Sequence, residues 1–283
     1  MWKRILLKNI EIKKKNLSFN KKNKVNNSTV FPFGETGVFP VLPPLGERGL
    51  RLKVCGMKHL ENIQQVAALQ PDYLGFIFYE KSKRNFEGVI PKLPKSIKKT
   101  GVFVNESLEI VVSLVEEYQL DAIQLHGDEP VEYILKLKEY IRQVELDLAS
   151  HNEMLKQVQH KQDQSDRRVE IIKVFGIKDD FDFDILKPYE EVVDFFLFDT
   201  KGKERGGNGI PFDWNVLKNY NSQKPYFLSG GIGLDNIDSL LSFLRRQESK
   251  YCYAIDVNSK FESESGVKKI EDLKRFKKDL TGF

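Results

Sequence analysis

Two side chains in this sequence could exchange protons with a substrate, and each stands where a short apolar strand would end. Cys55 closes the run 52–55, and Asp199 directly follows the run 195–198. A thiol becomes a general base once it ionises, which a nearby cation such as Lys53 favours. A carboxyl group that loses hydration has a raised pKa and can hold a proton near neutral pH. The alternatives are a buried apolar filler for Cys55 and a loop-capping aspartate at 199.

Anion-binding groups follow other predicted strands. Gly230 and Gly231 would let backbone N–H groups approach a ligand closely, and Ser259 would begin a short helix after the last strand. Phosphate is commonly bound at these two places in parallel barrels, although a tight turn is the simpler interpretation of the glycines. Arg84 lies in a loop on the same side and could grip a carboxylate bidentately, or be an ordinary solvated charge.

These groups share a site only if the chain brings the strand ends together, and the apolar pattern predicts that it does. Eight short, near-continuously apolar runs alternate with helical patterns, as is typical of parallel strands covered by helices. The predicted strands are 52–55, 73–78, 101–104, 122–125, 171–175, 195–198, 226–228 and 254–257. The predicted helices are 60–69, 93–97, 107–120, 131–140, 183–189, 214–220, 236–243 and 270–280.

Eight strand–helix repeats predict an α/β fold, a single (β/α)8 barrel of the TIM-barrel type over residues 51–283. Its active site would lie at the carboxyl ends of the strands. A doubly wound open sheet is the rival, but it usually begins with a glycine-rich dinucleotide fingerprint, and none follows the first run.

Two stretches fall outside the repeat pattern. Residues 1–50 hold ten Lys or Arg and three Glu, and the part from Phe31 to Gly49 is rich in proline and glycine. We expect a disordered basic extension or a stretch upstream of the true start, with a transit peptide or a polyanion-binding arm as alternatives. The polar segment 146–168 indicates an extended or additional helix plus a surface insertion.

Composition excludes several function classes. The net charge of +4 comes from residues 1–50, so no basic face on a folded unit predicts nucleic-acid binding. The apolar runs are too short for a membrane span, and no secretory signal precedes the barrel. Two cysteines, Cys55 and Cys252, fit a cytoplasmic protein without disulfides. The four histidines and two cysteines show no metal-ligand spacing, so we expect no metal site.

Several motifs in order resemble the phosphoribosylanthranilate isomerase family of tryptophan biosynthesis, over residues 52–280. They are Lys53-Val54-Cys55-Gly56-Met57, Ser82-Lys83-Arg84, Gln124-Leu125-His126-Gly127, Asp199 with Gly206-Gly207-Asn208-Gly209 and Phe212-Asp213-Trp214, Leu228-Ser229-Gly230-Gly231-Ile232, and Asp256-Val257-Asn258-Ser259. The resemblance implies an Amadori rearrangement of N-(5-phosphoribosyl)anthranilate to a 1-deoxyribulose phosphate, without a cofactor and with no partner beyond this phosphorylated substrate. It leaves a monomer or a homodimer open.

The resemblance also implies roles for the matching residues. Asp199 would be the general acid that opens the ribose ring, and Cys55 would be the general base that removes the C2′ proton. Arg84 would bind the anthranilate carboxylate, whereas Gly230, Gly231 and Ser259 would hold the phosphate. Two positions depart from the family pattern: Lys260 replaces a glycine after Ser259, and Asn208 replaces a threonine.

Two other function classes stay open on the sequence. One is a related phosphate-binding barrel enzyme, such as the histidine-pathway isomerase or indole-glycerol-phosphate synthase. The histidine-pathway isomerase would be expected to carry an aspartate where this chain has Cys55. The other is a barrel that binds phosphate as a sensor or scaffold without turnover.

Overall fold

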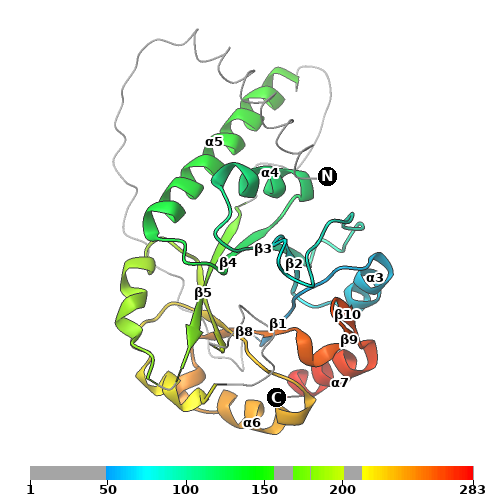
Figure 1. Ribbon diagram of the computed structural model, residues 1–283, viewed down its shortest axis with the longest axis vertical. Helices are drawn as coiled ribbons and strands as arrows, with labels where there is room; N and C mark the ends of the chain where they lie inside the picture. Colours follow the sequence, from blue (N-terminus) through cyan, green and yellow to red (C-terminus); the bar gives the residue numbers. More distant parts are fainter. Residues whose placement is uncertain (1–48, 156–167, 179, 201–211, 283) are drawn as a thin grey trace.

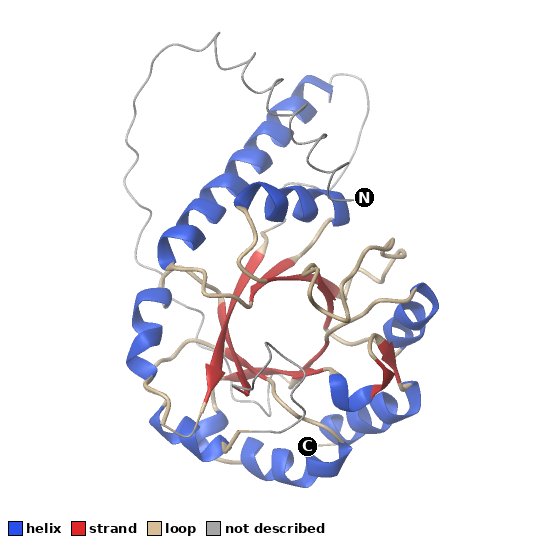
Figure 2. Cartoon of the chain, viewed as in Figure 1, coloured by secondary structure: helices blue, strands red, loops and turns tan. Residues whose placement is uncertain are grey.

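Eight parallel strands close into a barrel in chain order, and β8 pairs back onto β1. The computed structural model describes residues 49–155, 168–178, 180–200 and 212–282. The strands are β1 (Arg51–Val54), β2 (Tyr73–Ile77), β3 (Lys98–Phe103), β4 (Ala122–Leu125), β5 (Glu170–Ile177), β6 (Phe195–Thr200), β7 (Tyr226–Leu228) and β8 (Cys252–Val257). Figures 1 and 2 show the ring of strands with the helices outside it. The predicted (β/α)8 barrel is confirmed.

The strands are apolar on both faces because each face is buried against something different. Inward-facing side chains such as Tyr73, Ile172, Leu197 and Phe227 fill the barrel interior. Outward-facing ones such as Phe76 pack with the helices in a larger outer core. This double burial explains why the sequence shows continuous apolar runs rather than alternation.

The helices that cover the barrel correspond to the predicted amphipathic segments. They are α3 (Leu60–Ala68), α4 (Leu108–Tyr118), α5 (Val131–Leu155), α6 (Ile237–Leu244) and α7 (Ile270–Thr281). The predicted helices after β5 and β6 are 3-10 helices, η1 (Phe183–Tyr189) and η2 (Trp214–Asn219). Their tighter winding suits the short connections that they make.

The predicted helix over residues 93–97 is wrong. This connection between β2 and β3 is a loop, with one turn closed by the Ile97 N–H, which donates to the Pro94 carbonyl. Pro94 has no N–H to give to a helix, and it pushes the preceding Leu93 toward extended backbone. Ile97 is buried and anchors the loop to the core without helical winding.

A short hairpin after β8 was not predicted. The turn η5 (Ser259–Phe261) leads into β9 (Glu262–Glu264), which pairs antiparallel with β10 (Val267–Lys268). Figure 1 shows this hairpin beside α3 and α7. It brings charged side chains from the end of the chain close to the mouth of the barrel.

Other predictions lie partly or wholly outside the described residues. The proposed extension includes residues 1–48, and the proposed insertion includes residues 156–167, neither of which the structure describes. The lengthening of the helix before the insertion is confirmed, since α5 continues to Leu155.

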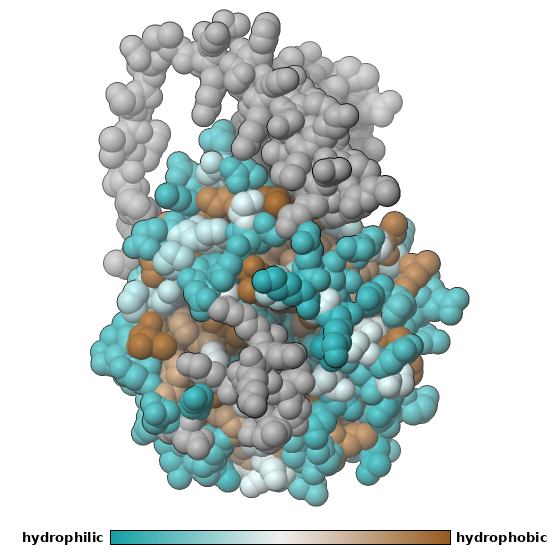
Figure 3. Space-filling model, viewed as in Figure 1, coloured by the Kyte–Doolittle hydropathy of each residue, from teal (hydrophilic) through white to brown (hydrophobic). Residues whose placement is uncertain are grey.

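The surface that faces the viewer in Figure 3 is mostly hydrophilic, with small separate apolar patches. Every helix in the described part of the chain is too short or too polar to cross a bilayer.

Candidate active site

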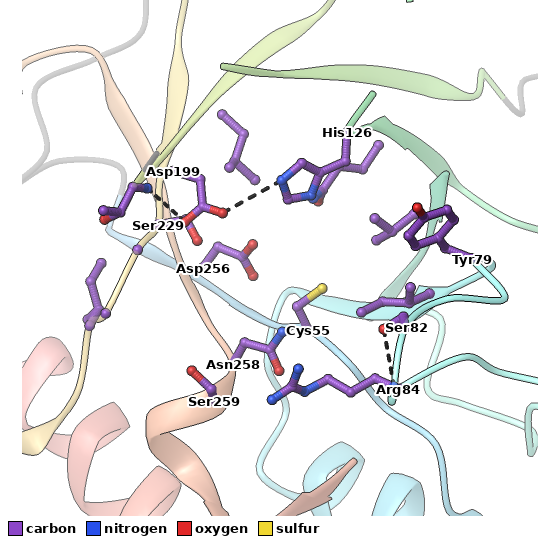
Figure 4. A pocket seen from close by; sticks show the side chains of 18 of the residues that line it. Cys55, Tyr79, Ser82, Arg84, His126, Asp199, Ser229, Asp256, Asn258 and Ser259 are labelled. Atoms are coloured by element: carbon purple, nitrogen blue, oxygen red, sulfur yellow. Dashed lines mark hydrogen bonds and ion pairs between the residues drawn. The ribbon is translucent and has the colours of Figure 1, made fainter. Parts of the chain in front are cut away.

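All six predicted site residues line one pocket at the carboxyl ends of the strands. Its lining includes Cys55, Arg84, Asp199, Gly230, Gly231 and Ser259. The empty volume is about 830 Å³ including the open mouth. In Figure 4, Asp199 and His126 approach from one side of the pocket, and Cys55 and Arg84 approach from the other.

The thiol of Cys55 is held at the end of β1 by the closure of the barrel. Its backbone N–H donates to the Val257 carbonyl at 2.9 Å. Gly75 on β2 leaves room for it, because a Cβ at Gly75 would lie 2.7 Å from Cys55 Sγ. Burial raises the pKa of the Cys55 thiol, while the ammonium groups of Lys53 and Lys268 act in the opposite direction.

Lys53 and Asp256 form a fully buried ion pair beneath the thiol. Lys53 Nζ donates to Asp256 Oδ2 at 2.9 Å across the β1–β8 seam. Burial disfavours the charge on Lys53, but Asp256 and then Cys55 outweigh it, so its pKa is raised. Among the described residues, Asp256 Oδ1 has no hydrogen-bond partner. Asp256 lines the pocket, and within the part of the chain that the structure describes its side chain pairs with Lys53.

Asp199, at the end of β6, has the properties of a proton donor. Its Oδ1 accepts a hydrogen bond from the Thr200 N–H at 2.9 Å. Burial and the nearby Asp256 raise the pKa of Asp199 from 3.8 to about 6, against the stabilising hydrogen bond from Thr200. The desolvation expected from the apolar strand is therefore present.

His126 contacts the candidate acid, although its role was not assigned from the sequence. Its Nε2 lies 3.6 Å from Asp199 Oδ2. The following loop is fixed by the buried Glu129, whose Oε2 accepts from the Gly127 N–H at 2.9 Å and from Lys173 Nζ at 3.0 Å. A buried ion pair in the barrel thus holds the β4 loop that carries His126 into the pocket.

Arg84 reaches the pocket but already contacts a protein carboxylate. Its Nε lies 2.9 Å from Glu262 Oε1, and its Nη2 lies 2.6 Å from Glu262 Oε2. Gly56 leaves space for the Arg84 side chain, because a Cβ at Gly56 would lie 2.7 Å from Arg84 Cδ. Its φ of +75° is also a backbone conformation that favours glycine. The sequence argument expected a guanidinium available to a ligand, and it missed this partner.

The loops after β7 and β8 form the other end of the pocket. Gly230 and Gly231 have φ values of +93° and +62°. A side chain at Gly230 would also clash, because its Cβ would lie 2.2 Å from Thr200 Oγ1. Ser259 begins η5, as the short helix predicted after the last strand. These turns leave backbone groups exposed to the pocket rather than covered by side chains.

The pocket also contains or contacts three residues to which the sequence argument gave no role, namely His126, Asp256 and Glu262. His126 and Asp256 follow or end predicted strands, so their positions at the mouth were readable from the sequence. The position of Glu262 could not be predicted, because it lies in a hairpin whose sequence shows no periodic pattern of apolar residues. Within the described residues, no cluster of three His, Cys, Asp or Glu is placed to hold a metal ion.

Comparison with known proteins identifies the family. The model of the N-(5′-phosphoribosyl)anthranilate isomerase family matches residues 52–167 and 156–279. The chain belongs to this family. The isomerase of Parabacteroides distasonis is 37% identical over 231 residues, which cover 80% of this chain and 90% of that protein. The isomerase of Caldanaerobacter subterraneus is 34% identical, with 82% of this chain and 98% of that protein covered.

Solved structures of phosphoribosylanthranilate isomerases share the barrel. The Thermotoga maritima enzyme is 30% identical, with 83% of this chain and all of that chain covered and a TM-score of 0.63. Another structure is that of a phosphoribosylanthranilate isomerase in complex with reduced 1-(o-carboxyphenylamino)-1-deoxyribulose 5-phosphate. It is 28% identical, with 83% of this chain and all of that chain covered and a TM-score of 0.59.

Of the two positions that depart from the family pattern, the structure describes one, Lys260. Lys260 lines the pocket beside Ser259, and its Nζ forms an ion pair with Asp235 Oδ2 at 2.7 Å. It thereby links the loop after β8 to the loop after β7. Asn208 lies outside the described residues.

Proposed function

We propose that this phosphoribosylanthranilate isomerase converts N-(5′-phosphoribosyl)anthranilate to 1-(o-carboxyphenylamino)-1-deoxyribulose 5-phosphate by general acid–base catalysis, as a step of tryptophan biosynthesis. One observation carries the mechanism. A carboxyl group whose pKa is raised to about 6 and a thiol face the same pocket from opposite sides. Two groups in different environments are what a reaction with separate proton donor and acceptor requires.

The first step is opening of the ribose ring. Asp199 gives its proton to the ring oxygen as the C1′–O bond breaks, and the nitrogen lone pair forms the C1′=N bond of a Schiff base. Burial keeps this proton on Asp199 at a pH where an exposed aspartate would have lost it.

The second step is proton removal from carbon. Cys55, as its thiolate, takes the C2′ proton, and the electron pair of that C–H bond forms an enolamine with C1′. Tautomerisation of the enolamine then gives the ketone. Lys53 and Lys268 favour the thiolate by their charge, and no covalent bond to sulfur is formed.

The substrate is held at its two ends. Arg84 binds the anthranilate carboxylate next to Cys55, and Gly230, Gly231 and Ser259 bind the phosphate through the loops after β7 and β8. Both anchors line the same pocket as the reacting groups. Fixing both ends places the C1′ and C2′ atoms between the acid and the base, which supplies orientation.

Further properties belong to the proposal. Residues 51–283 would form the single catalytic domain, with residues 1–50 outside it. The enzyme would act in the cytoplasm as a monomer or a homodimer, without a cofactor, nucleic acid or membrane. The Thermotoga maritima enzyme, 27% identical to this chain in a structure of its monomers, is described as dimeric.

The test is a fluorescence assay with purified protein. The wild-type protein is expected to consume phosphoribosylanthranilate with no added cofactor, and Cys55→Ala or Asp199→Asn should each lower kcat by about 10²- to 10⁴-fold. Cys252→Ala is the matched control, because this second buried thiol lies at the amino end of β8, whereas the pocket lies at the carboxyl ends of the strands. Turnover that survives either site substitution would refute the assigned roles.

A further inference from the structure

Two buried charged side chains beside the pocket are not among the proton donors, proton acceptors or substrate anchors above, although the charge of Lys268 favours the Cys55 thiolate. Glu262 and Lys268 stand on the β9–β10 hairpin, and their side chains are 5% and 0% exposed. Burying an ion pair is costly unless the geometry is good and its other hydrogen-bonding groups are satisfied. The contacts of this pair lead directly to Arg84.

Glu262 occupies one edge of the Arg84 guanidinium and leaves another edge open. The hydrogen bonds use Nε and Nη2, which is the side edge of the group. Within the described residues, Nη1 of Arg84 donates no hydrogen bond. A guanidinium carries five N–H donors in a rigid plane, so the end edge, formed by Nη1 and Nη2, can still grip a second carboxylate. Fixing the side edge fixes the direction of the end edge.

Lys268 in turn fixes Glu262 and the pocket wall. Its Nζ donates to Glu262 Oε1 at 2.6 Å and to Asn258 Oδ1 at 2.7 Å. Asn258 lines the pocket next to Arg84. One buried ammonium group therefore connects the carboxylate behind Arg84 with the loop after β8.

The charges of the three groups suit this arrangement. An Arg84–Glu262 pair alone would be neutral and would attract a substrate carboxylate weakly. With Lys268 protonated, the cluster carries one net positive charge, which complements one carboxylate.

We propose that Glu262 and Lys268 are positioning residues that hold the Arg84 guanidinium with its end edge toward the anthranilate carboxylate and so determine selectivity for a carboxylated ring. This rests on the proposed function, since the carboxylate belongs to that substrate. The cluster acts through Arg84, and neither Glu262 nor Lys268 contacts the reacting atoms.

The first experiment compares two ligands that differ only in the carboxylate. The probes are the reduced product analogue, 1-(o-carboxyphenylamino)-1-deoxyribitol 5-phosphate, and the same compound without the ring carboxylate. Glu262→Gln should weaken binding of the carboxylated probe about tenfold and leave the other unchanged, because a charge-assisted contact that orients Arg84 is lost. Glu264→Gln removes the same charge from an exposed position of the hairpin and should change neither.

The second experiment asks whether the effect passes through Arg84. In a double-mutant cycle, Glu262→Gln should have no further effect on binding once Arg84 is alanine, because coupled residues are not additive. Lys268→Met should also weaken the carboxylated probe selectively, with the exposed Lys269→Met as its control. Melting temperatures identify any variant that loses binding through unfolding.

Equal weakening of both probes, or no weakening of either, would overturn the inference, as would additive effects in the cycle. Failure of the proposed function would look different. In that case the wild-type protein would not consume phosphoribosylanthranilate, whatever the probe titrations show.

Discussion

Burial acts on the catalytic groups on both sides of the pocket, but the acid needs a raised pKa and the base needs a lowered one. Burial raises the pKa of Asp199 on one side and of Cys55 on the other. A raised pKa helps an acid to keep its proton but opposes formation of the thiolate that a base requires.

The difference lies in what surrounds each group. On the Asp199 side, burial and the nearby Asp256 both raise the pKa, and the hydrogen bond from Thr200 only moderates their effect. The Cys55 side gathers cations, with Lys53 on β1 and Lys268 on β10 both favouring the thiolate. Burial is the main cause of the raised pKa of the acid, with a contribution from Asp256 on β8. The base depends on two cations, Lys53 of its own strand and Lys268 of the β9–β10 hairpin.

Among substitutions that test the difference between the two sides, Lys53→Met should lower the free energy of unfolding most. It leaves Asp256 as an unpaired buried charge and removes the nearest cation from Cys55. Breaking a buried pair typically costs about 3–5 kcal/mol, so urea unfolding should show a loss of that size.

A double variant separates stability from catalysis. Lys53→Met with Asp256→Leu removes both charges and should recover most of the free energy of unfolding, while kcat stays low. A single variant that unfolds like the wild-type protein would show that the pair is not needed to compensate Asp256.

The second largest effect on the free energy of unfolding should come from the buried carboxyl group of Asp199, whose ionisation destabilises the folded protein. Because its pKa is raised in the folded state, the unfolded chain binds fewer protons between 3.8 and about 6, and the free energy of unfolding falls across that pH range. The rise from 3.8 to about 6 corresponds to about 3 kcal/mol. Asp199→Asn should therefore stabilise the protein by up to about that much above pH 6 and by nothing below pH 3.8.

The same pKa should be visible in the pH dependence of kcat/KM. With protonated Asp199 and ionised Cys55 as the active form, kcat/KM should rise to about pH 6, stay level, and fall once the pH exceeds the pKa of the thiol. In Asp199→Asn the break near pH 6 should vanish, and the residual activity should continue to rise with thiol ionisation. Persistence of that break would assign it to another group.

The smallest effect is expected from Gly75→Ala. The added Cβ would lie 2.7 Å from Cys55 Sγ, so the thiol must move. A displaced catalytic group should lower kcat about tenfold, and overpacking should cost about 1–3 kcal/mol. Gly88→Ala is the control, since its nearest contact would be 3.5 Å from Phe86 at an exposed position. An unchanged kcat in Gly75→Ala would mean that the thiol position is not critical.

The sequence predicted the barrel and the six pocket residues because strand ends are local features. Each apolar run ends at a recognisable residue, and the fold places all those ends together. It could not predict that Arg84 pairs with Glu262, because the two are 178 residues apart and the hairpin has no periodic signal. The wrong helix at 93–97 has a local cause, since Pro91 and Pro94 oppose helical winding at a place where the strand–helix repeat predicts a helix.

The seam between β1 and β8 also bears on how the active site arises during synthesis. Lys53 and Asp256 are separated by 203 residues, and Cys55 is fixed by the Val257 carbonyl. These contacts of the first strand cannot form until the last strand has been synthesised. Because domains tend to fold as units, a truncated chain that lacks β8 would lose the hydrogen bond that fixes Cys55, the buried partner of Lys53 and the carboxylate that raises the pKa of Asp199. The position of the catalytic thiol therefore depends on closure of the barrel.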